Sequence, residues 1–335
     1  MKPIVSIIIP AKNEAKFISE CIESVQNQSF LDFEVIVVDD NSTDSTFEIL
    51  QDFSKKDHRI KVLKNNGNGI ISALRLAFEN TEGDYITRMD ADDRMKPNKI
   101  QVLHKGLNSK GNGYLAVGGV EYFSENNELG TGFKRYEEWL NNLTASGENF
   151  KDIFKECVIP SPCWMISRMD LINVNAFDEE RYPEDYDLAF RFYEAGYKVL
   201  PTKEIVHEWR DYPTRTSRTH ENYADYTFTP IKMHYFLKLH YDREKKIVVF
   251  GASYRGKELA KYLSKHSIDF LWVGSNPNKI GKHIYDKLIL SIDRVEDLYN
   301  KQFLITVANE SHKNEINLFL SDQGLKELDD YFFFA

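Results

Sequence analysis

Cysteine and long apolar runs are both scarce in this sequence. The three cysteines, Cys21, Cys157 and Cys163, show no metal-ligand spacing and cannot all pair within one chain, so we expect free thiols in a reducing compartment. No run approaches the roughly 18 apolar residues of a membrane-spanning helix, and the sequence after Met1 shows no signal peptide. We therefore expect a cytoplasmic protein, and leave open a peripheral association with the inner face of the membrane.

Basic charge is also in short supply. The chain carries 43 Lys and Arg against 52 Asp and Glu, a net charge of -9. Because nucleic-acid binding needs a basic face that neutralises phosphates, we expect no nucleic-acid partner. A small anionic ligand held by a few placed donors remains compatible with this balance. With 335 residues, of which 42% are hydrophobic, the chain is long enough for two domains.

The first third of the chain alternates strand-like and helical patterns. Short runs rich in Ile and Val occupy 4–10, 33–40, 59–63 and 84–90, and helical spacing occupies 14–28, 42–56 and 71–80. This alternation predicts an α/β fold with a buried parallel sheet and right-handed crossovers. Ser42 and Asp44 are expected to cap the second helix.

The middle of the chain is less regular. Residues 113–123 predict one further strand, and the polar stretch 124–149, which lacks clear periodicity, predicts an excursion over the surface. Residues 157–168 predict a strand that packs over the expected ligand site at the strand ends of the first domain, followed by a short helix. Residues 182–200 predict a helix followed by a strand. We place the first domain at 1–221, a linking helix at 222–244 and a second domain at 245–335.

The second domain begins with a strand, a glycine turn and a helix, which predicts a small Rossmann-like α/β unit. The turn contains Gly251 and Gly256, but a dinucleotide site also needs an acidic residue about 20 positions further on to hold the ribose. The second strand instead ends in Gly274, Ser275 and Asn276. We interpret the turn as structural or vestigial rather than as a NAD site.

Polar side chains follow all four strands of the first domain. The ends of these strands are 10–14, 39–41, 65–69 and 90–93. Because ligands of parallel sheets bind beyond the carboxyl ends of the strands, this rim is the expected site.

Three carboxylates, Asp90, Asp92 and Asp93, crowd into four positions of that rim. A turn or a helix cap would use one of them, and Asp93 is the candidate cap. All three would repel one another unless a cation or ligand offsets their charge. Oxygen ligands favour Mg²⁺ or Mn²⁺, which few carboxylates hold when diphosphate completes the coordination.

Each of two further groups of residues has two alternative interpretations, one structural and one functional. Glu184 and Asp185 head a helix, where they either favour its dipole or supply a general base. The basic segment 209–220 is either a solvated loop or a diphosphate clamp. The clamp interpretation uses Arg210, Arg215 and Arg218, with His220 or His207 as an added metal ligand.

Together these motifs resemble glycosyltransferase family 2, enzymes with a GT-A fold that use nucleotide-diphosphate sugars. The resemblance covers most of 4–200 and rests on "VSIIIPAKNEAKFISECIESVQNQSF", "FEVIVVDDNSTDST", "GDYITRMDADD" and "PEDYDLAFRFYEAGYKV". It implies a mixed sheet flanked by helices, and the second domain is similar to that of a bacterial subgroup.

The resemblance also implies roles for individual residues. The donor nucleotide site would consist of Pro10, Ala11, Asn13, Glu14, Asp40, Arg75, Asp90, Ala91 and Asp92. Asp40 would bond the base, commonly uracil, Asp90 would lie near the ribose, and Asp92 would hold the metal. Asp185, beside Glu184, would be the catalytic base. Leu76 stands where many relatives carry Asn, which leaves the nucleotide contacts of this segment open.

The expected activity is inverting, metal-dependent sugar transfer with Mn²⁺ or Mg²⁺. The donor would be a nucleotide-diphosphate sugar, with UDP-sugar expected, and the acceptor a hydroxyl of a glycan or lipid-linked glycan in bacterial surface polysaccharide biosynthesis. Tyr182 and Trp164 would form an acceptor platform, with a core role as the alternative for Trp164.

Three other functions remain as alternatives. A sugar-1-phosphate nucleotidyltransferase would need a phosphate loop rich in Gly and Arg after the first strand, which is missing. A NAD-dependent sugar-modifying enzyme would need the missing acidic residue. A catalytically silent nucleotide-sugar binder or assembly protein is disfavoured by the presence of Asp92 and Asp185. The sequence leaves the donor sugar, the linkage and the oligomeric state undetermined.

Overall fold

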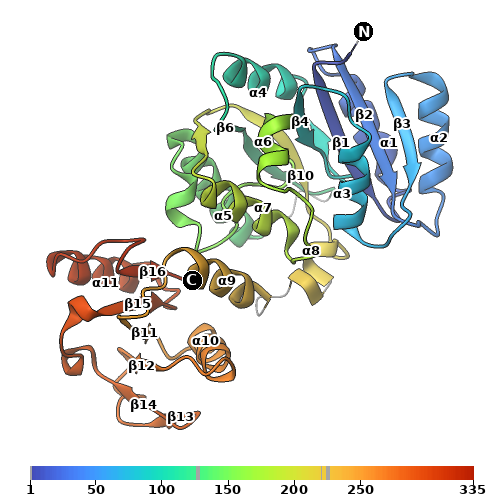
Figure 1. Ribbon diagram of the computed structural model, residues 1–335. Coiled ribbons are helices and arrows are strands. Elements are labelled where there is room, and N and C mark those ends of the chain that lie inside the picture. Colours follow the sequence, from blue (N-terminus) through green and yellow to red (C-terminus); the bar gives the residue numbers. More distant parts are fainter. Residues whose placement is uncertain (1, 126–128, 220, 224–226) are drawn as a thin grey trace. The chain divides into compact units, whose positions relative to one another are not determined.

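The computed structural model describes residues 2–125, 129–219, 221–223 and 227–335 (Figure 1). The chain divides into two compact units, 1–150 with 158–215, and 151–157 with 216–335. The first unit thus ends earlier than the expected boundary at 221. Helix α9 (Phe228–Leu239) belongs to the second unit instead of standing between two domains. Among the described residues, no helix combines the length and apolar character needed to span a bilayer.

The first unit is built on a mixed seven-stranded sheet in the order β3-β2-β1-β4-β8-β6-β9. Its strands are β1 (Val5–Ala11), β2 (Phe33–Asp39), β3 (Ile60–Lys64), β4 (Tyr85–Arg88), β6 (Tyr114–Val117), β8 (Trp164–Ser167) and β9 (Lys198–Leu200). The first four are parallel, as predicted, while β8 runs antiparallel to β4 and β6. The carboxyl ends of β1, β2 and β4 therefore meet at one edge.

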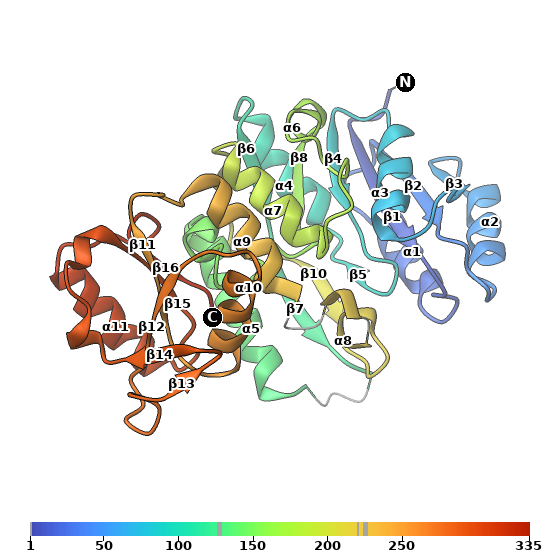
Figure 2. The same ribbon diagram turned by 60° about the horizontal axis from the view of Figure 1, so that its bottom comes forward.

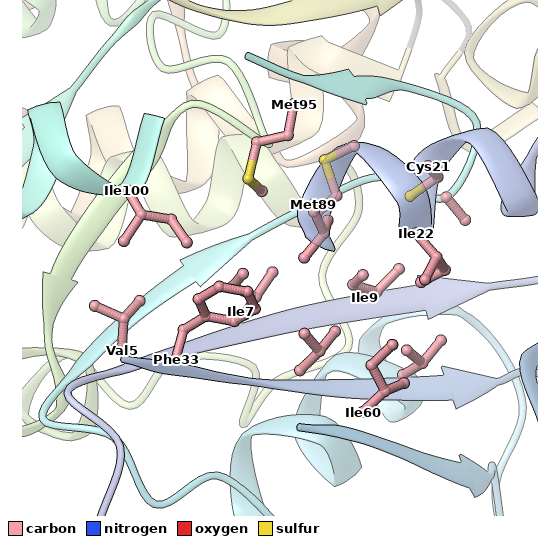
Figure 3. Packing of buried hydrophobic residues seen from close by; sticks show 14 of the residues in the cluster. Val5, Ile7, Ile9, Cys21, Ile22, Phe33, Ile60, Met89, Met95 and Ile100 are labelled. Carbon is pink, nitrogen blue, oxygen red and sulfur yellow. The ribbon is translucent and has the colours of Figure 1, made fainter. Parts of the chain in front are cut away.

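Helices cover both faces of this sheet. They are α1 (Ile18–Gln26), α2 (Thr46–Lys56), α3 (Ile70–Glu79), α4 (Lys99–Asn108), α6 (Arg168–Asn173) and α7 (Glu184–Glu194), while α5 (Thr131–Ser146) packs on β7 (Gly119–Phe123). Alternate residues of β1, such as Val5, Ile7 and Ile9, face Cys21 and Ile22 of α1 (Figure 3). The opposite face of β1 and β2 contacts α3. Because each face of the sheet is buried, the strands are apolar throughout, which explains their clear sequence signal.

Residues 113–123 form two strands rather than the single strand predicted. β6 belongs to the large sheet, whereas β7 (Gly119–Phe123) joins β5 (Arg94–Met95) and β10 (Ile205–Arg210) in a separate three-stranded sheet. The chain changes sheets at Gly118, where a Cβ atom would lie 2.2 Å from Cγ2 of Val206. Periodicity alone cannot reveal this change, because both strands are apolar.

The polar stretch predicted to be an irregular excursion contains helix α5. Only Leu140, Leu143 and Thr144 of this helix are buried, so its apolar stripe is too narrow to stand out in the sequence. The predicted cap residues also differ. Asp44 Oδ1 accepts from the amide of Thr46 (3.0 Å), but Ser42 Oγ accepts from the amide of Asn13 (2.9 Å) and not from the helix.

The second unit is a doubly wound α/β domain whose sheet has the order β13-β14-β12-β11-β15-β16. Its strands are β11 (Lys246–Phe250), β12 (Phe270–Val273), β13 (His283–Ile284), β14 (Lys287–Leu290), β15 (Lys301–Ile305) and β16 (Tyr331–Phe333). Helices α8 (Thr216–Thr219) and α9 precede them. Helices α10 (Tyr254–Lys265) and α11 (Glu310–Asp322) lie on opposite sides of these strands (Figure 2). The β13–β14 hairpin was not predicted.

We expect opposite effects from adding one methyl group at two glycines of the first unit. Gly118→Ala should lower the free energy of unfolding by about 1–3 kcal/mol, because the new Cβ overlaps Val206. Gly106→Ala, in the interior of α4, should raise it by about 0.5–1 kcal/mol. The Gly106 Cβ would meet only Leu200 Cδ1 at 3.7 Å. Urea unfolding measures both, and equal shifts would contradict the assigned crowding at Gly118.

Candidate active site

Asp90 is tied to the start of helix α7 through one arginine. Arg88 Nε donates to Asp90 Oδ1 (2.7 Å), and Nη1 of the same guanidinium donates to Glu184 Oε1 (3.1 Å). Ser161 Oγ donates to the other oxygen of Asp90 (2.9 Å). The side chains of Arg88 and Glu184 are 6% and 4% exposed. The acidic strand end and the Glu184–Asp185 pair therefore belong to one site.

Asp92 has more negative charge around it than its partners offset. Its Oδ2 accepts from the hydroxyl of Tyr212 (3.0 Å) and lies 3.8 Å from Arg215 Nε. Burial, together with Asp93 and Asp90, raises the pKa of Asp92 to about 6. A cation bound to these oxygens would remove that penalty, so the donor set fits the expected Mg²⁺ or Mn²⁺.

The protein supplies few ligands for such a cation. Within the described part of the chain, no three His, Cys, Asp or Glu side chains are grouped so that they could hold a metal ion. A cation at Asp92 would therefore need oxygens from a bound diphosphate as well, which is common for Mg²⁺.

Asp93 lies inside the site and does not cap a helix. Its Oδ2 lies 3.0 Å from His207 Nε2, and its Oδ1 accepts from the amide of Arg210 (2.7 Å). Neither Asp93 nor His207 is exposed, and burial raises the pKa of Asp93 to about 7 and lowers that of His207. Helix α4 begins at Lys99 with Asn98 before it. The prediction of Asp93 as the cap is wrong, and His207, an alternative metal ligand, is paired with Asp93.

A buried lysine lies behind these carboxylates. Lys99 is fully buried, and its Nζ donates to the carbonyl oxygens of Arg88 (3.0 Å) and Pro162. Burial lowers its pKa to about 8, while the nearby Asp90 and Asp93 raise it. Lys99 thus ties the end of β4 to the segment before β8 and offsets part of the charge of the acidic strand end.

Asp185 has the properties of a general base. It lies in the first turn of α7 and is half-buried, and its Oδ1 accepts from the amide of Tyr186 (2.8 Å). Burial and the neighbouring Glu184 raise the pKa of Asp185 to about 7. A carboxylate with a pKa near neutral pH is a better proton acceptor than an ordinary one, and a substantial fraction of it remains ionised.

The end of β2 forms a second part of the rim. Asp40 accepts from Asn65 Nδ2 (2.6 Å), from the amide of Gly69 (3.0 Å) and from Lys12 Nζ (3.0 Å). The hydroxyl of Tyr182 lies 3.0 Å from the place a Cβ would take at Gly69. These contacts bring the loops after β2 and β3 next to the segment that precedes α7.

Comparison with known proteins identifies the family. The family model for "Glycosyl transferase family 2" matches residues 6–174. The chain belongs to glycosyltransferase family 2. This assignment confirms the predicted family and makes the protein a transferase enzyme. The fourth motif, at 183–199, lies beyond the matched residues.

Curated relatives of this glycosyltransferase come from several bacteria. Glycosyltransferase GlyG of Streptococcus pneumoniae is 27% identical over 63% of this chain and 71% of its own length. An uncharacterized glycosyltransferase of Haemophilus influenzae is 26% identical over 97% of this chain and 95% of its own. The second alignment extends over both units.

Solved structures support the GT-A fold. Staphylococcus aureus TarS 1–349 in complex with UDP-GlcNAc has a TM-score of 0.54 at 18% identity, covering 78% of this chain and 72% of its own. The mannosyltransferase PcManGT from Pyrobaculum calidifontis, in complex with GDP-Man and Mn²⁺, has a TM-score of 0.51 at 16% identity, covering 71% and 64%. The predicted mixed sheet flanked by helices is confirmed.

The residues at the end of β1 that were predicted to bind the sugar donor differ in burial and in hydrogen bonding. Pro10 is half-buried at the strand end, whereas the side chain of Ala11 is 2% exposed and lies in the core. Asn13 has a left-handed φ of 55°, and its Oδ1 accepts from the amide of Thr43 (2.8 Å). Burial and the nearby Asp92 raise the pKa of Glu14 to about 8.

Two predicted ligand contacts are placed elsewhere by the fold. Arg75 Nε and Nη2 donate to the carbonyl oxygens of Phe177 (2.9 Å) and Asp178 (3.1 Å), so its guanidinium holds a loop rather than the rim. Trp164 is 2% exposed and packs edge to face against Phe192. The core alternative for Trp164 therefore describes its position, and a surface platform does not.

Other predicted residues are buried or lie elsewhere. The methyl group of Ala91 lies in the core. Arg210 lies over the ring of Phe17, and its Nε donates to the carbonyl oxygen of Asp92 (2.7 Å), which makes it a structural residue. Arg218 is exposed on α8, in the second unit. His220 lies outside the described residues.

Arg88, Lys99 and Tyr212 were missed by the sequence reasoning. Arg88 had a usable signal, since an arginine at the end of a buried strand has to meet a carboxylate. Tyr212 lies within the basic segment 209–220, but nothing there marks the tyrosine itself, and Lys99 had no signal in its neighbouring sequence.

We expect Arg88→Met to lower the free energy of unfolding by about 3–5 kcal/mol, because it leaves two carboxylates, Asp90 and Glu184, without their shared cation. Arg59→Met is the matched control. Its guanidinium pairs with Asp57, only two residues away, and is 24% exposed. The control should cost about 1 kcal/mol or less. Equal losses in urea unfolding would contradict the bridging role of Arg88.

Proposed function

We propose that this glycosyltransferase transfers a sugar, with inversion, from a nucleotide-diphosphate donor to a hydroxyl of a glycan or lipid-linked glycan. A UDP-sugar is the expected donor, and bacterial surface polysaccharide synthesis at the inner face of the membrane is the expected setting. The observation that carries the proposal is the Arg88 bridge, because it holds the acidic strand end and the Glu184–Asp185 pair in one site.

The proposed base is Asp185, which would take the proton of the acceptor hydroxyl as that oxygen attacks the anomeric carbon. Glu184 is paired with Arg88, and burial together with the neighbouring Glu184 raises the pKa of Asp185 to about 7. The nucleoside diphosphate would leave from the opposite face of the sugar, which gives inversion.

The donor would lie along the rim formed by Asn13, Asp40 and Asp90. Arg215, whose Nε lies 3.8 Å from Asp92 Oδ2, is the proposed contact for the diphosphate. Asp92 would hold the divalent cation, which when bound would offset negative charge on the leaving diphosphate. The bound ligands named for TarS and PcManGT, UDP-GlcNAc and GDP-Man with Mn²⁺, support a donor of this class.

Asp185→Asn should lower kcat for sugar transfer by about 10²–10⁴, because the acceptor hydroxyl loses its general base. In the wild type, kcat should fall as pH drops below about 7, since the pKa of Asp185 is raised to about 7 and the protonated acid cannot accept a proton. Steady-state assays with saturating acceptor measure both effects. Asp178→Asn, at an exposed carboxylate of the same unit, is the control and should leave kcat unchanged. A wild-type rate in Asp185→Asn would refute the base assignment.

Removal of divalent cations should abolish transfer, and Mn²⁺ should restore it. The reason is that Asp92 lies in an acidic cluster whose charge would repel a diphosphate. The measurement is donor binding and transfer with EDTA, then with added Mn²⁺ or Mg²⁺. Asp92→Asn should show weakened Mn²⁺ dependence of donor binding. Undiminished transfer in EDTA would mean that Arg215 can offset the diphosphate charge without a cation. The cation role of Asp92 would then be wrong.

A further inference from the structure

The second unit has a topological switch point next to its first strand. β11 pairs in parallel with β12 on one side and with β15 on the other. The chain leaves β11 through α10 toward β12, and later returns to β15 on the opposite side. In doubly wound sheets, ligands bind in the crevice that this reversal opens beyond the carboxyl ends of the strands.

A small pocket lies at this end of the second unit. Thr306 directly follows β15, Phe334 directly follows β16, and Arg255 and Leu259 come from the first two turns of α10. The complete lining is Glu156, Phe228, Thr229, Lys232, Arg255, Leu259, Thr306 and Phe334.

The charges in this pocket favour an anion. Arg255 is half-buried, and its guanidinium makes no hydrogen bond or ion pair with any residue in the described ranges. Lys232 is 5% exposed, and its Nζ donates to the carbonyl oxygens of Lys155 (2.8 Å) and Phe334 (3.2 Å). Two cations therefore face one carboxylate, Glu156, in a protein whose net charge is -9.

The rest of the lining suits a hydroxylated ring. Phe228, Phe334 and Leu259 supply apolar faces, while Thr229 and Thr306 supply hydroxyl groups. Glu156 Oε1 accepts from the amide of Cys157 (3.1 Å), which holds the carboxylate at the wall of the pocket.

The glycine turn between β11 and α10 is explained by close packing, and this packing also brings α10 to the proposed site. A Cβ at Gly256 would lie 2.0 Å from the carbonyl oxygen of Gly251. Only glycine therefore allows α10 to begin directly against the strand ends, which brings Arg255 to the crevice.

The same turn disfavours a dinucleotide. Lys279 Nζ donates to the carbonyl oxygen of Ala252 (2.6 Å), on the β12 side of the turn. No acidic residue among Gly274, Ser275 and Asn276 follows β12 to hold a ribose. The described pocket lies on the β15 side only.

We propose that this pocket binds a small phosphorylated metabolite, a sugar phosphate or nucleoside monophosphate. The phosphate would contact Arg255, and the rest of the ligand would contact the half-buried residues Phe228 and Thr229. This proposal is independent of the transferase site in the first unit.

Calorimetric titration of the full chain, in buffer without divalent cations, tests the proposal. The probes are inorganic phosphate, glucose 1-phosphate and UMP, which share the phosphate and differ in the ring. Arg255→Ala should weaken binding of the tightest probe by roughly tenfold or more, because a charged hydrogen-bond donor is lost. Thr229→Phe, which fills the pocket without changing its charge, should weaken it as well.

Arg243→Ala is the matched control, since it removes an exposed arginine of the same unit outside the pocket. It should bind like the wild type, and thermal unfolding checks that all variants fold. The probe with the highest affinity identifies the ring. Absence of binding by all three probes at millimolar concentration overturns the proposal. Binding that survives both Arg255→Ala and Thr229→Phe also overturns it, because the probe then binds elsewhere, for instance at the rim containing Asp92.

Discussion

The first unit depends on how it stabilises four carboxylates that crowd at the carboxyl edge of its sheet. Asp90, Asp92, Asp93 and Glu184 would repel one another strongly in a buried site. Arg88 is the central stabilising residue, because its guanidinium donates hydrogen bonds to Asp90 and Glu184, which lie far apart in sequence. This single side chain joins the β4 end to the start of α7, so the architecture of the site follows from an electrostatic constraint.

The remaining charges are arranged around that bridge. His207 pairs with Asp93, and Lys99 lies behind the strand end with its ammonium group on backbone carbonyls. Asp92 is left with a hydroxyl and a distant guanidinium as partners. The negative charge that the protein leaves unbalanced is therefore concentrated at Asp92, where a cation and its diphosphate would supply the balance. A site built this way favours its ligand because the empty site is electrostatically costly.

The two units use the same edge of an α/β sheet with opposite charge. The first presents carboxylates beyond β1, β2 and β4, whereas the second presents Arg255 and Lys232 beyond β11 and β15. The acidic rim suits a ligand that arrives with a metal ion, and the basic pocket suits an anion that arrives alone. Shared topology would thus set where each proposed ligand binds, while the side chains at the strand ends would set its charge.

Local periodicity by itself determined the strands β1–β4, the helices α1–α3, the Rossmann-like second unit and the acidic strand end, because apolar spacing and strand-end polarity are visible within a few residues. The Glu184–Asp185 pair was also visible at the head of its helix, and the family resemblance favoured the general-base interpretation of Asp185. Only the tertiary structure decided which polar groups meet. It directed Arg75 to the carbonyl oxygens of Phe177 and Asp178, buried Trp164, and gave Asp93 to His207. It also split 113–123 at Gly118 and made α5 from a polar stretch. The physical reason is that a hydrogen bond or an ion pair depends on atoms distant in sequence, whereas burial of an apolar stripe is encoded along the element itself.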